Sequence, residues 1–153
     1  MRVIAIDGPA GAGKSTVARQ VSTATGLRYL DTGAMYRCVA LAVQQSSTDA
    51  HDAEAVGKIA REVSVVIGRD ASMLNGIDVS SEIRSSEING IVSIIAAHTP
   101  VRDAMRMQQR QWIETNGGGV VEGEKRATVG GEVLRERGLA GLPGAGEQHH
   151  PGV

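Results

Sequence analysis

Apolar and polar residues follow two kinds of periodicity, which alternate from the start of the chain to about residue 123. Short runs rich in β-branched residues predict buried strands, and apolar residues spaced three or four positions apart predict amphipathic helices. The expected strands are 3–6, 27–31 and 119–123, and the expected helices are 14–25, 52–63, 86–97 and two more beginning at Thr32 and Thr99. This alternation is typical of an α/β fold with a parallel sheet.

Local end signals accompany several of these helices. Gly26 follows the first helix, where a C-cap favours a residue that tolerates positive φ. Thr32 and Thr99 are predicted N-caps, and Pro100 would occupy the first helical position after Thr99.

The stretch 64–79 has a different character, because β-branched residues surround the dipeptide Asn75-Gly76. That dipeptide favours a two-residue hairpin turn, so we expect a small β insertion. The helix expected after it carries an apolar stripe made of Ile88, Ile91, Val92 and Ile95. The insertion and this helix together span about 64–97.

The segment 2–16, RVIAIDGPAGAGKST, joins the first expected strand to the first expected helix. Gly8, Gly13, Lys14 and Ser15 match the spacing G-x-x-x-x-G-K-[ST] of a phosphate-binding loop. Backbone N–H groups of such a loop surround phosphate oxygens, Lys14 would add a positive charge, and Ser15 would offer its hydroxyl to Mg²⁺. The alternative is a glycine-rich loop with an incidental exposed lysine; the strand before it and the helix after it favour phosphate binding.

Composition limits the partners of a 153-residue chain that is long enough for one domain. The net charge is −1, from 16 basic and 17 acidic residues, so we expect no nucleic-acid polymer as partner and an anion held by a few placed groups. The lone Cys38 is expected to be buried and reduced. No apolar stretch approaches the roughly 20 residues of a spanning helix. We therefore expect no membrane association and a cytoplasmic monomer.

Glycine accumulates toward the end of the chain, where 11 of the 20 glycines lie in the last 37 residues. We expect 129–137 to form at most a short amphipathic helix and the tail 124–153 to be poorly ordered. His149 and His150 are interpreted as solvated side chains, because no Cys or acidic cluster accompanies them.

Five motifs in order, IDGPAGAGKST, LDTGAMYR, VSSEIRSSEI, TPVRDAMRMQQRQW and GGGVVEG, resemble bacterial cytidylate kinases over about residues 1–123. The combination is more specific than the phosphate-binding loop alone. The resemblance implies a P-loop nucleoside monophosphate kinase fold, with a parallel sheet flanked by helices, a monophosphate-binding insertion and a mobile lid. It also implies transfer of the γ-phosphoryl group from ATP to CMP or dCMP with Mg²⁺, in pyrimidine nucleotide metabolism.

The same resemblance implies roles for individual residues. The ATP-binding set is Gly8, Gly11, Ala12, Gly13, Lys14, Ser15 and Thr16, with Ser15 also on the metal. The acceptor-binding set is Thr32, Arg37, Ser93 and Arg102, where Ser93 reads the cytosine and Arg102 holds the monophosphate. Lys14, Arg37 and Arg102 are the expected catalytic residues.

Each of these residues also has a plainer interpretation. Thr32 could be only a helix cap, and Arg37 and Arg102 could be solvated arginines on helix surfaces. Ser93 could bond back to its own helical turn. Asp31 could cap or orient the loop without touching a ligand, and Met35 and Tyr36 are expected in the core.

The chain departs from the family pattern after Gly123. The family continues there into G-R-D and V-V-x-P-D-A, which supply an Arg and an Asp beside the phosphates, whereas this chain has Glu124-Lys125-Arg126-Ala127. The arginine-rich lid and the last strand and helix are also missing. We interpret this as a truncated chain, an altered reading frame or a remnant, with strand 119–122 short of one neighbour and phosphoryl transfer weak or absent.

Two other functions remain open from the sequence. One is a noncatalytic nucleotide-binding remnant of the same family. The other is a different P-loop small-molecule kinase, for a sugar acid or shikimate, although such a kinase would lack the insertion ending in Glu82-Ile83-Arg84. A GTPase is disfavoured because no N-K-x-D segment follows the loop.

Overall fold

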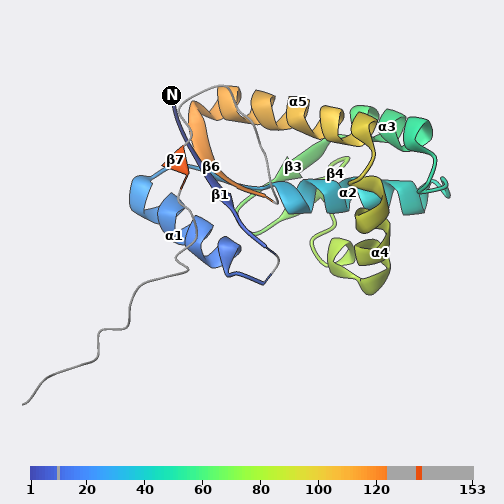
Figure 1. Cartoon of the computed structure of the whole chain (residues 1–153), viewed down its shortest axis with the longest axis horizontal. Coiled ribbons are helices and arrows are strands. Elements are labelled where there is room, and N and C mark those ends of the chain that lie inside the picture. Colours follow the sequence, from blue (N-terminus) through green and yellow to red (C-terminus); the bar gives the residue numbers. More distant parts are fainter. Residues whose placement is uncertain (10, 124–133, 136–153) are drawn as a thin grey trace, which may run out of the picture.

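A four-stranded parallel sheet forms the centre of the computed structural model, which describes residues 1–9, 11–123 and 134–135 (Figure 1). Its strands, in spatial order, are β2 (Tyr29–Asp31), β6 (Gly118–Gly123), β1 (Arg2–Asp7) and β7 (Leu134–Arg135). The parallel sheet expected from the sequence is confirmed. β2 begins two residues later than the pattern predicted.

Strand β6 lies in the interior of this sheet. It pairs with β1 from Arg2 opposite Gly118 to Asp7 opposite Gly123, and with β2 from Tyr29 opposite Val120 to Asp31 opposite Glu122. The expectation that this strand lacks a neighbour is therefore wrong, because β1 and β2 come from the start of the chain and cover both of its sides.

A two-residue strand lies in the segment for which we expected a helix. Leu134 and Arg135 pair in parallel with Ile4 and Ala5 of β1. The helix expected over 129–137 is therefore wrong at these two positions, where backbone pairing to the free side of β1 prevails. The rest of that segment, and the expectation of a poorly ordered tail, lie outside the described residues.

Helices cover both faces of the parallel sheet. Helix α1 (Lys14–Thr25) contacts β1, β2 and β6 on one face, and α2 (Thr32–Gln45) and α5 (Thr99–Asn116) contact β6 on the other (Figure 1). Side chains alternate accordingly. Ile4, Ile6, Tyr29 and Val120 share one core cluster with Ala18 of α1, whereas Val3, Leu30 and Val121 join the larger cluster on the opposite face.

The larger core cluster is aliphatic and includes Cys38 of α2, which is completely buried. Burial raises the pKa of the Cys38 thiol to about 11, so this residue packs as a small apolar side chain, as expected. Over the ranges that the structure describes, no helix combines the length and the apolar character needed to cross a bilayer.

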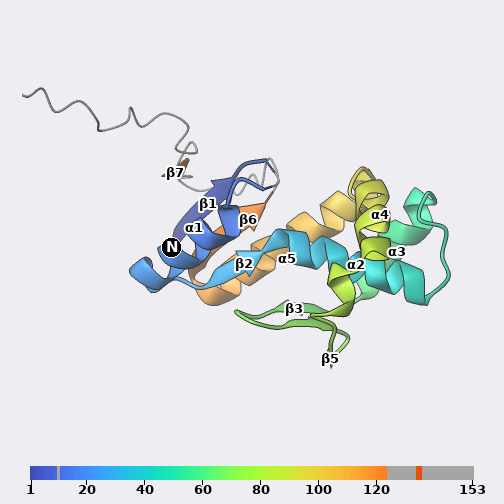
Figure 2. The same cartoon turned by 90° about the horizontal axis from the view of Figure 1, so that it is seen from below.

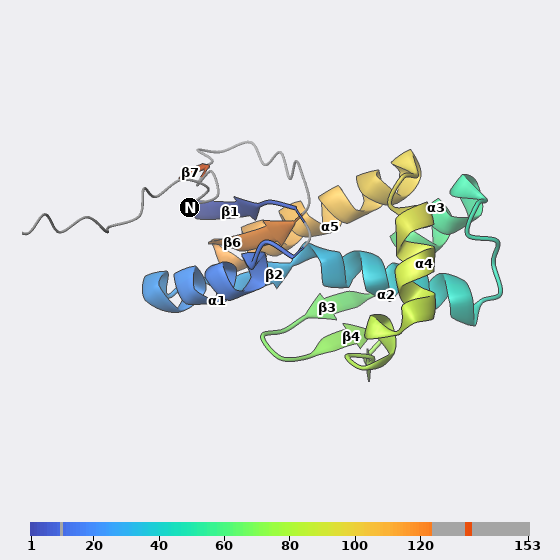
Figure 3. The same ribbon diagram turned by 60° about the horizontal axis from the view of Figure 1, so that its bottom comes forward.

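The expected β insertion is present as a separate antiparallel sheet, which Figures 2 and 3 show away from the parallel sheet and beside α2. Its strands are β3 (Val65–Ile67), β4 (Ser72–Leu74) and β5 (Ile77–Asp78). Asn75 and Gly76 have φ angles of 49° and 81°, as a tight hairpin turn requires. Helix α3 (Ala53–Glu62) precedes the insertion, and the 3-10 helix η1 (Glu82–Arg84) and helix α4 (Ser86–Ile95) follow it.

Two predicted N-caps are each wrong by one residue. The Asp31 side chain caps α2 by accepting from Ala34 N at 3.0 Å, and His98 occupies the cap position of α5. The threonines are engaged elsewhere, since Thr32 Oγ1 donates to Glu122 O at 2.7 Å and Thr99 Oγ1 accepts from Arg102 at 3.3 Å. Thr32 is thus engaged by a contact with the sheet, and Thr99 by a contact within the first turn of its own helix. The expected C-cap at Gly26 is confirmed by its φ of 69°.

Candidate functional site

The loop between β1 and α1 has the geometry of an anion cradle. Gly11 and Gly13 have φ angles of 78° and 77°, which favour glycine, and Ala12 N donates to Pro9 O at 3.2 Å. Lys14 Nζ folds back over the loop and donates to Gly8 O at 2.6 Å. Within the described residues no side chain caps the N-terminus of α1. Its first N–H groups are therefore available to an anion.

A cavity of about 520 Å³ opens beside this loop. Residues from α1, α2, η1, α4, α5 and the end of β6 line it. Five basic and two acidic side chains contribute to its walls: Lys14, Arg37, Arg84, Arg102, Arg106, Asp31 and Glu122. This excess of positive charge suits a ligand that carries several phosphate charges.

Most of the side chains predicted from the sequence meet in this cavity. Lys14 and Ser15, predicted for ATP, and Thr32, Arg37 and Arg102, predicted for the acceptor, all line it. The remaining predicted loop positions lie around the same turn or on the first turn of α1; they are Gly8, Gly11, Ala12, Gly13 and Thr16. The donor and acceptor sets are therefore adjacent in space although their motifs are separated along the chain.

Ser93 is placed differently from the other predicted acceptor residues. It is exposed on α4, and its Oγ donates to Asn89 O at 3.1 Å in the preceding turn. Its helix neighbours Val92 and Ala96 line the cavity instead. The structure therefore has Ser93 bonded to its own helical turn, which is the plainer of its two interpretations, and its role with cytosine stays a prediction.

Arg37 is held at the cavity by contacts with neighbouring elements, and Arg102 by a contact within its own helix. Arg37 Nη1 donates to Ile83 O at 3.2 Å and also to Asn89 Oδ1. Arg102 Nη2 donates to Thr99 Oγ1, but its Nε is buried and has no hydrogen-bond partner among the described residues. A buried donor without a partner is costly, so Arg102 suits an acceptor supplied by a ligand.

Thr32 and Gly123 fit closely together at the end of β6. A Cβ at position 123 would lie 2.7 Å from Thr32 Oγ1, so glycine there allows the Thr32 hydroxyl to reach Glu122 O. Thr32 is 5% exposed, and its hydroxyl fixes the start of α2 to the sheet in addition to lining the cavity.

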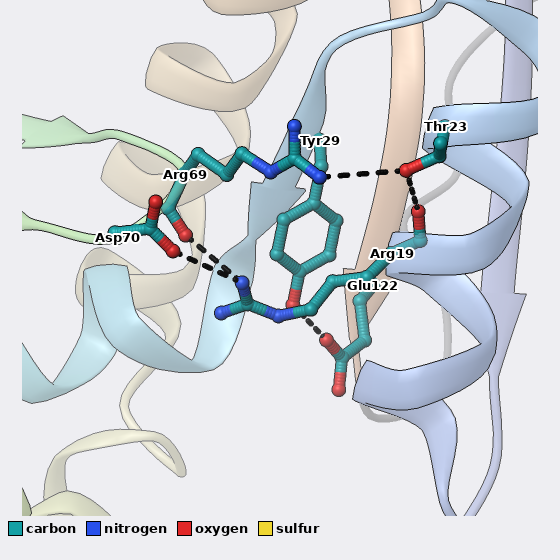
Figure 4. A network of polar contacts seen from close by, with 6 residues as sticks. All are labelled: Arg19, Thr23, Tyr29, Arg69, Asp70 and Glu122. Atoms are coloured by element: carbon teal, nitrogen blue, oxygen red, sulfur yellow. Dashed lines mark hydrogen bonds and ion pairs between the residues drawn. The ribbon is translucent and has the colours of Figure 1, made fainter.

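Glu122 is a site residue that the motif analysis missed. Its Oε2 accepts from the Tyr29 hydroxyl (Figure 4). Its Oε1 accepts from Ser15 Oγ at 2.8 Å, and only 6% of the residue is exposed. The available signal was an acidic residue at the carboxyl end of a buried strand, because the carboxyl ends of parallel strands meet at one edge of the sheet. The sequence pattern around Glu122 predicts only the end of a strand.

Tyr29 connects this carboxylate to a network on the surface of α1. The guanidinium of Arg19 lies 5.3 Å from the centre of the Tyr29 ring, and Arg19 Nη1 reaches Asp70 at 3.5 Å and Arg69 O at 3.1 Å (Figure 4). Burial, and secondly the hydrogen bond to Glu122, raise the pKa of Tyr29 well above its usual value. The Tyr29 hydroxyl therefore stays protonated and remains a donor to Glu122.

The donor set around Ser15 fits a magnesium ion that is carried by phosphates. Mg²⁺ prefers oxygen ligands and commonly takes only one or two from the protein, with waters and substrate phosphates completing its shell. Ser15 Oγ and the Glu122 carboxylate provide such oxygens 2.8 Å apart. In the described part of the chain no group of three or more His, Cys, Asp or Glu residues could hold a metal by itself. These residues would therefore hold Mg²⁺ together with a nucleotide.

Comparison with known families identifies the fold. A family model described as cytidylate kinase matches residues 4–137. The chain belongs to the cytidylate kinase family. The match continues through 124–137, beyond the range over which the motifs carry the resemblance, and it confirms the P-loop nucleoside monophosphate kinase fold class expected from the sequence.

Curated members of the cytidylate kinase family are similar to most of the chain. It is 47% identical over 127 residues to a cytidylate kinase of Mycobacterium leprae, covering 83% of the chain and 57% of that protein. It is 44% identical over 129 residues to a cytidylate kinase of Cupriavidus necator, covering 84% and 58%. A bifunctional pantoate ligase/cytidylate kinase of Parasynechococcus marenigrum is 48% identical over 126 residues, covering 79% and 25%. The chain thus spans less than two thirds of the length of these relatives.

Proposed function

We propose that this chain is an ATP-dependent kinase that transfers the γ-phosphoryl group to CMP or dCMP and yields CDP or dCDP. The observation that carries the proposal is the single cavity in which Lys14 and Ser15 of the phosphate-binding loop lie beside Arg37 and Arg102. Two anionic substrates would need such a convergence of cations. Membership of the cytidylate kinase family gives the substrate class.

The chemistry demands placement and positive charge more than a strong base, because the transition state spreads negative charge over the transferred group. The loop N–H groups and Lys14 would hold the ATP phosphates, and Arg37 and Arg102 would hold the acceptor phosphate. Ser15 and Glu122 would hold Mg²⁺, which neutralises phosphate charge when bound. Ser93 would have to exchange its bond to Asn89 for one to the cytosine.

We further propose that residues 1–123 act as the kinase core and that 64–97 act as the monophosphate-binding insertion. That the protein works as a monomer stays a prediction.

A coupled assay with ATP and CMP, combined with calorimetry, tests this function. We expect the 153-residue chain to bind both nucleotides and to form CDP slowly, because it lacks the Arg and Asp that the family carries after Gly123. Binding of both nucleotides without CDP would indicate a noncatalytic nucleotide-binding protein. Phosphorylation of shikimate or a sugar acid in preference to CMP would indicate a different small-molecule kinase.

Lys14→Ala tests the phosphate-binding loop itself. The lysine is part of the loop and not of the core, so the variant should fold normally but lose the rise in melting temperature that magnesium-ATP gives the wild type. A ligand at 100 times its Kd stabilises by about 2.7 kcal/mol, which a thermal scan resolves easily.

The matched control for this loop variant is Lys58→Ala, which removes an exposed lysine of α3 that lies 4.0 Å from Glu62. The control should keep the full ATP-dependent rise. If Lys14→Ala also keeps it, the loop does not bind the ATP phosphates.

A further inference from the structure

The hydroxyl of Tyr29 makes a contact that the proposed reaction does not by itself explain. Tyr29 lies in β2, is 8% exposed, and donates its hydroxyl hydrogen to Glu122 Oε2. We propose that Tyr29 is a positioning residue that holds the Glu122 carboxylate against Ser15 and thereby determines how tightly the loop binds magnesium-ATP. This inference rests on the proposed function, because it concerns the magnesium site of that function.

The two oxygens of Glu122 receive hydrogen bonds from opposite sides. Oε2 accepts from Tyr29 in the neighbouring strand (Figure 4), and Oε1 accepts from Ser15 at the start of α1. The register places Tyr29 opposite Val120, two residues before Glu122, so both side chains are on the α1 face of the sheet. Paired backbones therefore fix the distance between the tyrosine and the carboxylate.

The orientation of Ser15 follows from that of Glu122. A serine hydroxyl has one hydrogen to donate and two lone pairs. When Ser15 donates to Glu122, its lone pairs remain available to a cation at the loop. A carboxylate that turned away would leave the Ser15 hydrogen without this acceptor, and the hydroxyl could then point its hydrogen toward the metal position.

Among the described residues, no side chain other than Tyr29 and Ser15 is seen to hydrogen-bond to the Glu122 carboxylate. Lys14, the lysine of the loop, donates to Gly8 O, and the guanidinium of Arg19 lies over the Tyr29 ring. The ring of Tyr29 packs in the cluster with Ile4, Ile6, Ala18 and Val120, so the aromatic body fills space while the hydroxyl serves the carboxylate. Phenylalanine at position 29 would pack in the same way but could not donate a hydrogen bond to Glu122.

The test uses calorimetry of ATP binding to the 153-residue chain, once with Mg²⁺ and once with EDTA. Tyr29→Phe should weaken magnesium-ATP binding by about 10-fold, since loss of a partner behind a metal ligand commonly costs 10- to 100-fold in metal affinity. Binding in EDTA should stay within about 2-fold of the wild type, because the proposed contact acts only through the metal site. A general distortion of the loop would instead weaken ATP binding to the same extent with Mg²⁺ and with EDTA.

Two further variants show whether the effect passes through Glu122. Ser22→Ala removes another partly buried hydroxyl of α1, which donates to Leu27 O at 2.6 Å and does not contact Glu122, so it should leave both affinities unchanged. In a Glu122→Gln background, Tyr29→Phe should add less than about 2-fold to the loss, as residues in one network are not additive. 4-Aminophenylalanine in place of Tyr29 keeps a donor on the same ring and should restore binding. If Tyr29→Phe fails to fold, 4-fluorophenylalanine at this position replaces it, because this side chain fills the space of tyrosine without a hydrogen to donate.

The outcomes separate this inference from the proposed function. If the wild type binds magnesium-ATP and Tyr29→Phe binds it equally well, or loses the same factor in EDTA, Tyr29 does not position the metal site and the kinase proposal stands. If the wild type binds no ATP with or without Mg²⁺, both proposals are overturned.

Discussion

The buried Nε of Arg102 gives the acceptor side of the cavity its clearest residue-scale prediction. Arg102→Ala should weaken CMP binding by about 10-fold or more, because a hydrogen bond to a charged group is worth about 1.5–3 kcal/mol. ATP binding should change much less, since the phosphate-binding loop does not depend on Arg102. Titration calorimetry with each nucleotide separately measures the two losses.

Arg110→Ala is the matched control, because Arg110 is an exposed arginine of the same helix that does not line the cavity. It should leave both affinities unchanged. Equal losses of CMP and ATP affinity in Arg102→Ala would contradict an acceptor-side role and point to a general electrostatic effect.

Sequence motifs could predict the residues whose chemistry is local to a motif. The spacing around Lys14 and Ser15 is sufficient to predict a phosphate-binding loop, and the motifs containing Arg37 and Arg102 predicted residues that line the same cavity. Glu122 and Tyr29 were missed because their contact depends on the register between β2 and β6. No short-range pattern encodes that register, since the two strands are separated by almost ninety positions, from Asp31 to Gly118.

At the scale of single elements, the sequence predicted the helices, the hairpin and the C-cap at Gly26, but the N-caps predicted for α2 and α5 are wrong by one residue. Adjacent candidates compete at the starts of α2 and α5, and contacts with Glu122 and Arg102 draw Thr32 and Thr99 away from the cap role. Helix α3 has no such competition, and the side chain of Asp52 caps it by accepting from Ala55 N at 3.0 Å.

Asp52→Ala should therefore lower the free energy of unfolding by about 1 kcal/mol, the usual value of an N-cap side chain. Thr99→Ala should change it by no more than about 0.5 kcal/mol, because Thr99 is not the cap and its bond to Arg102 is exposed. Urea denaturation of the two variants against the wild type measures both values. A larger loss from Thr99→Ala than from Asp52→Ala would reverse this assignment of caps.

At the scale of the whole molecule, the order of elements could be predicted but the order of strands could not. Alternating strands and helices indicated a parallel sheet, yet no local signal shows that the late strand β6 enters between β1 and β2. That insertion brings Glu122 to the loop, so the site exists only after the two ends of the described 1–123 segment have paired.

The interior position of β6 predicts a specific pattern of hydrogen exchange. Val120 and Val121 lie in a strand bonded on both sides and are at most 2% exposed, so their amides should exchange only through global unfolding, together with Ile4 of β1. The sheet β3-β4-β5 has two short edge strands, and Val66 and Ile77 in it are 58% and 68% exposed, so its amides should exchange through a smaller, local opening.

Native-state exchange followed by NMR, in low concentrations of denaturant, measures an opening free energy for each amide. The values for β6 and β1 should coincide with the free energy of unfolding, and those for β4 should be lower by at least about 1 kcal/mol, since opening energies range from near zero to the global value. Exchange of Val120 as fast as the amides of the β3-β4-β5 sheet would show that β6 is an edge strand in solution. The contact between Glu122 and Ser15 would then not be supported by pairing of β6 with both β1 and β2.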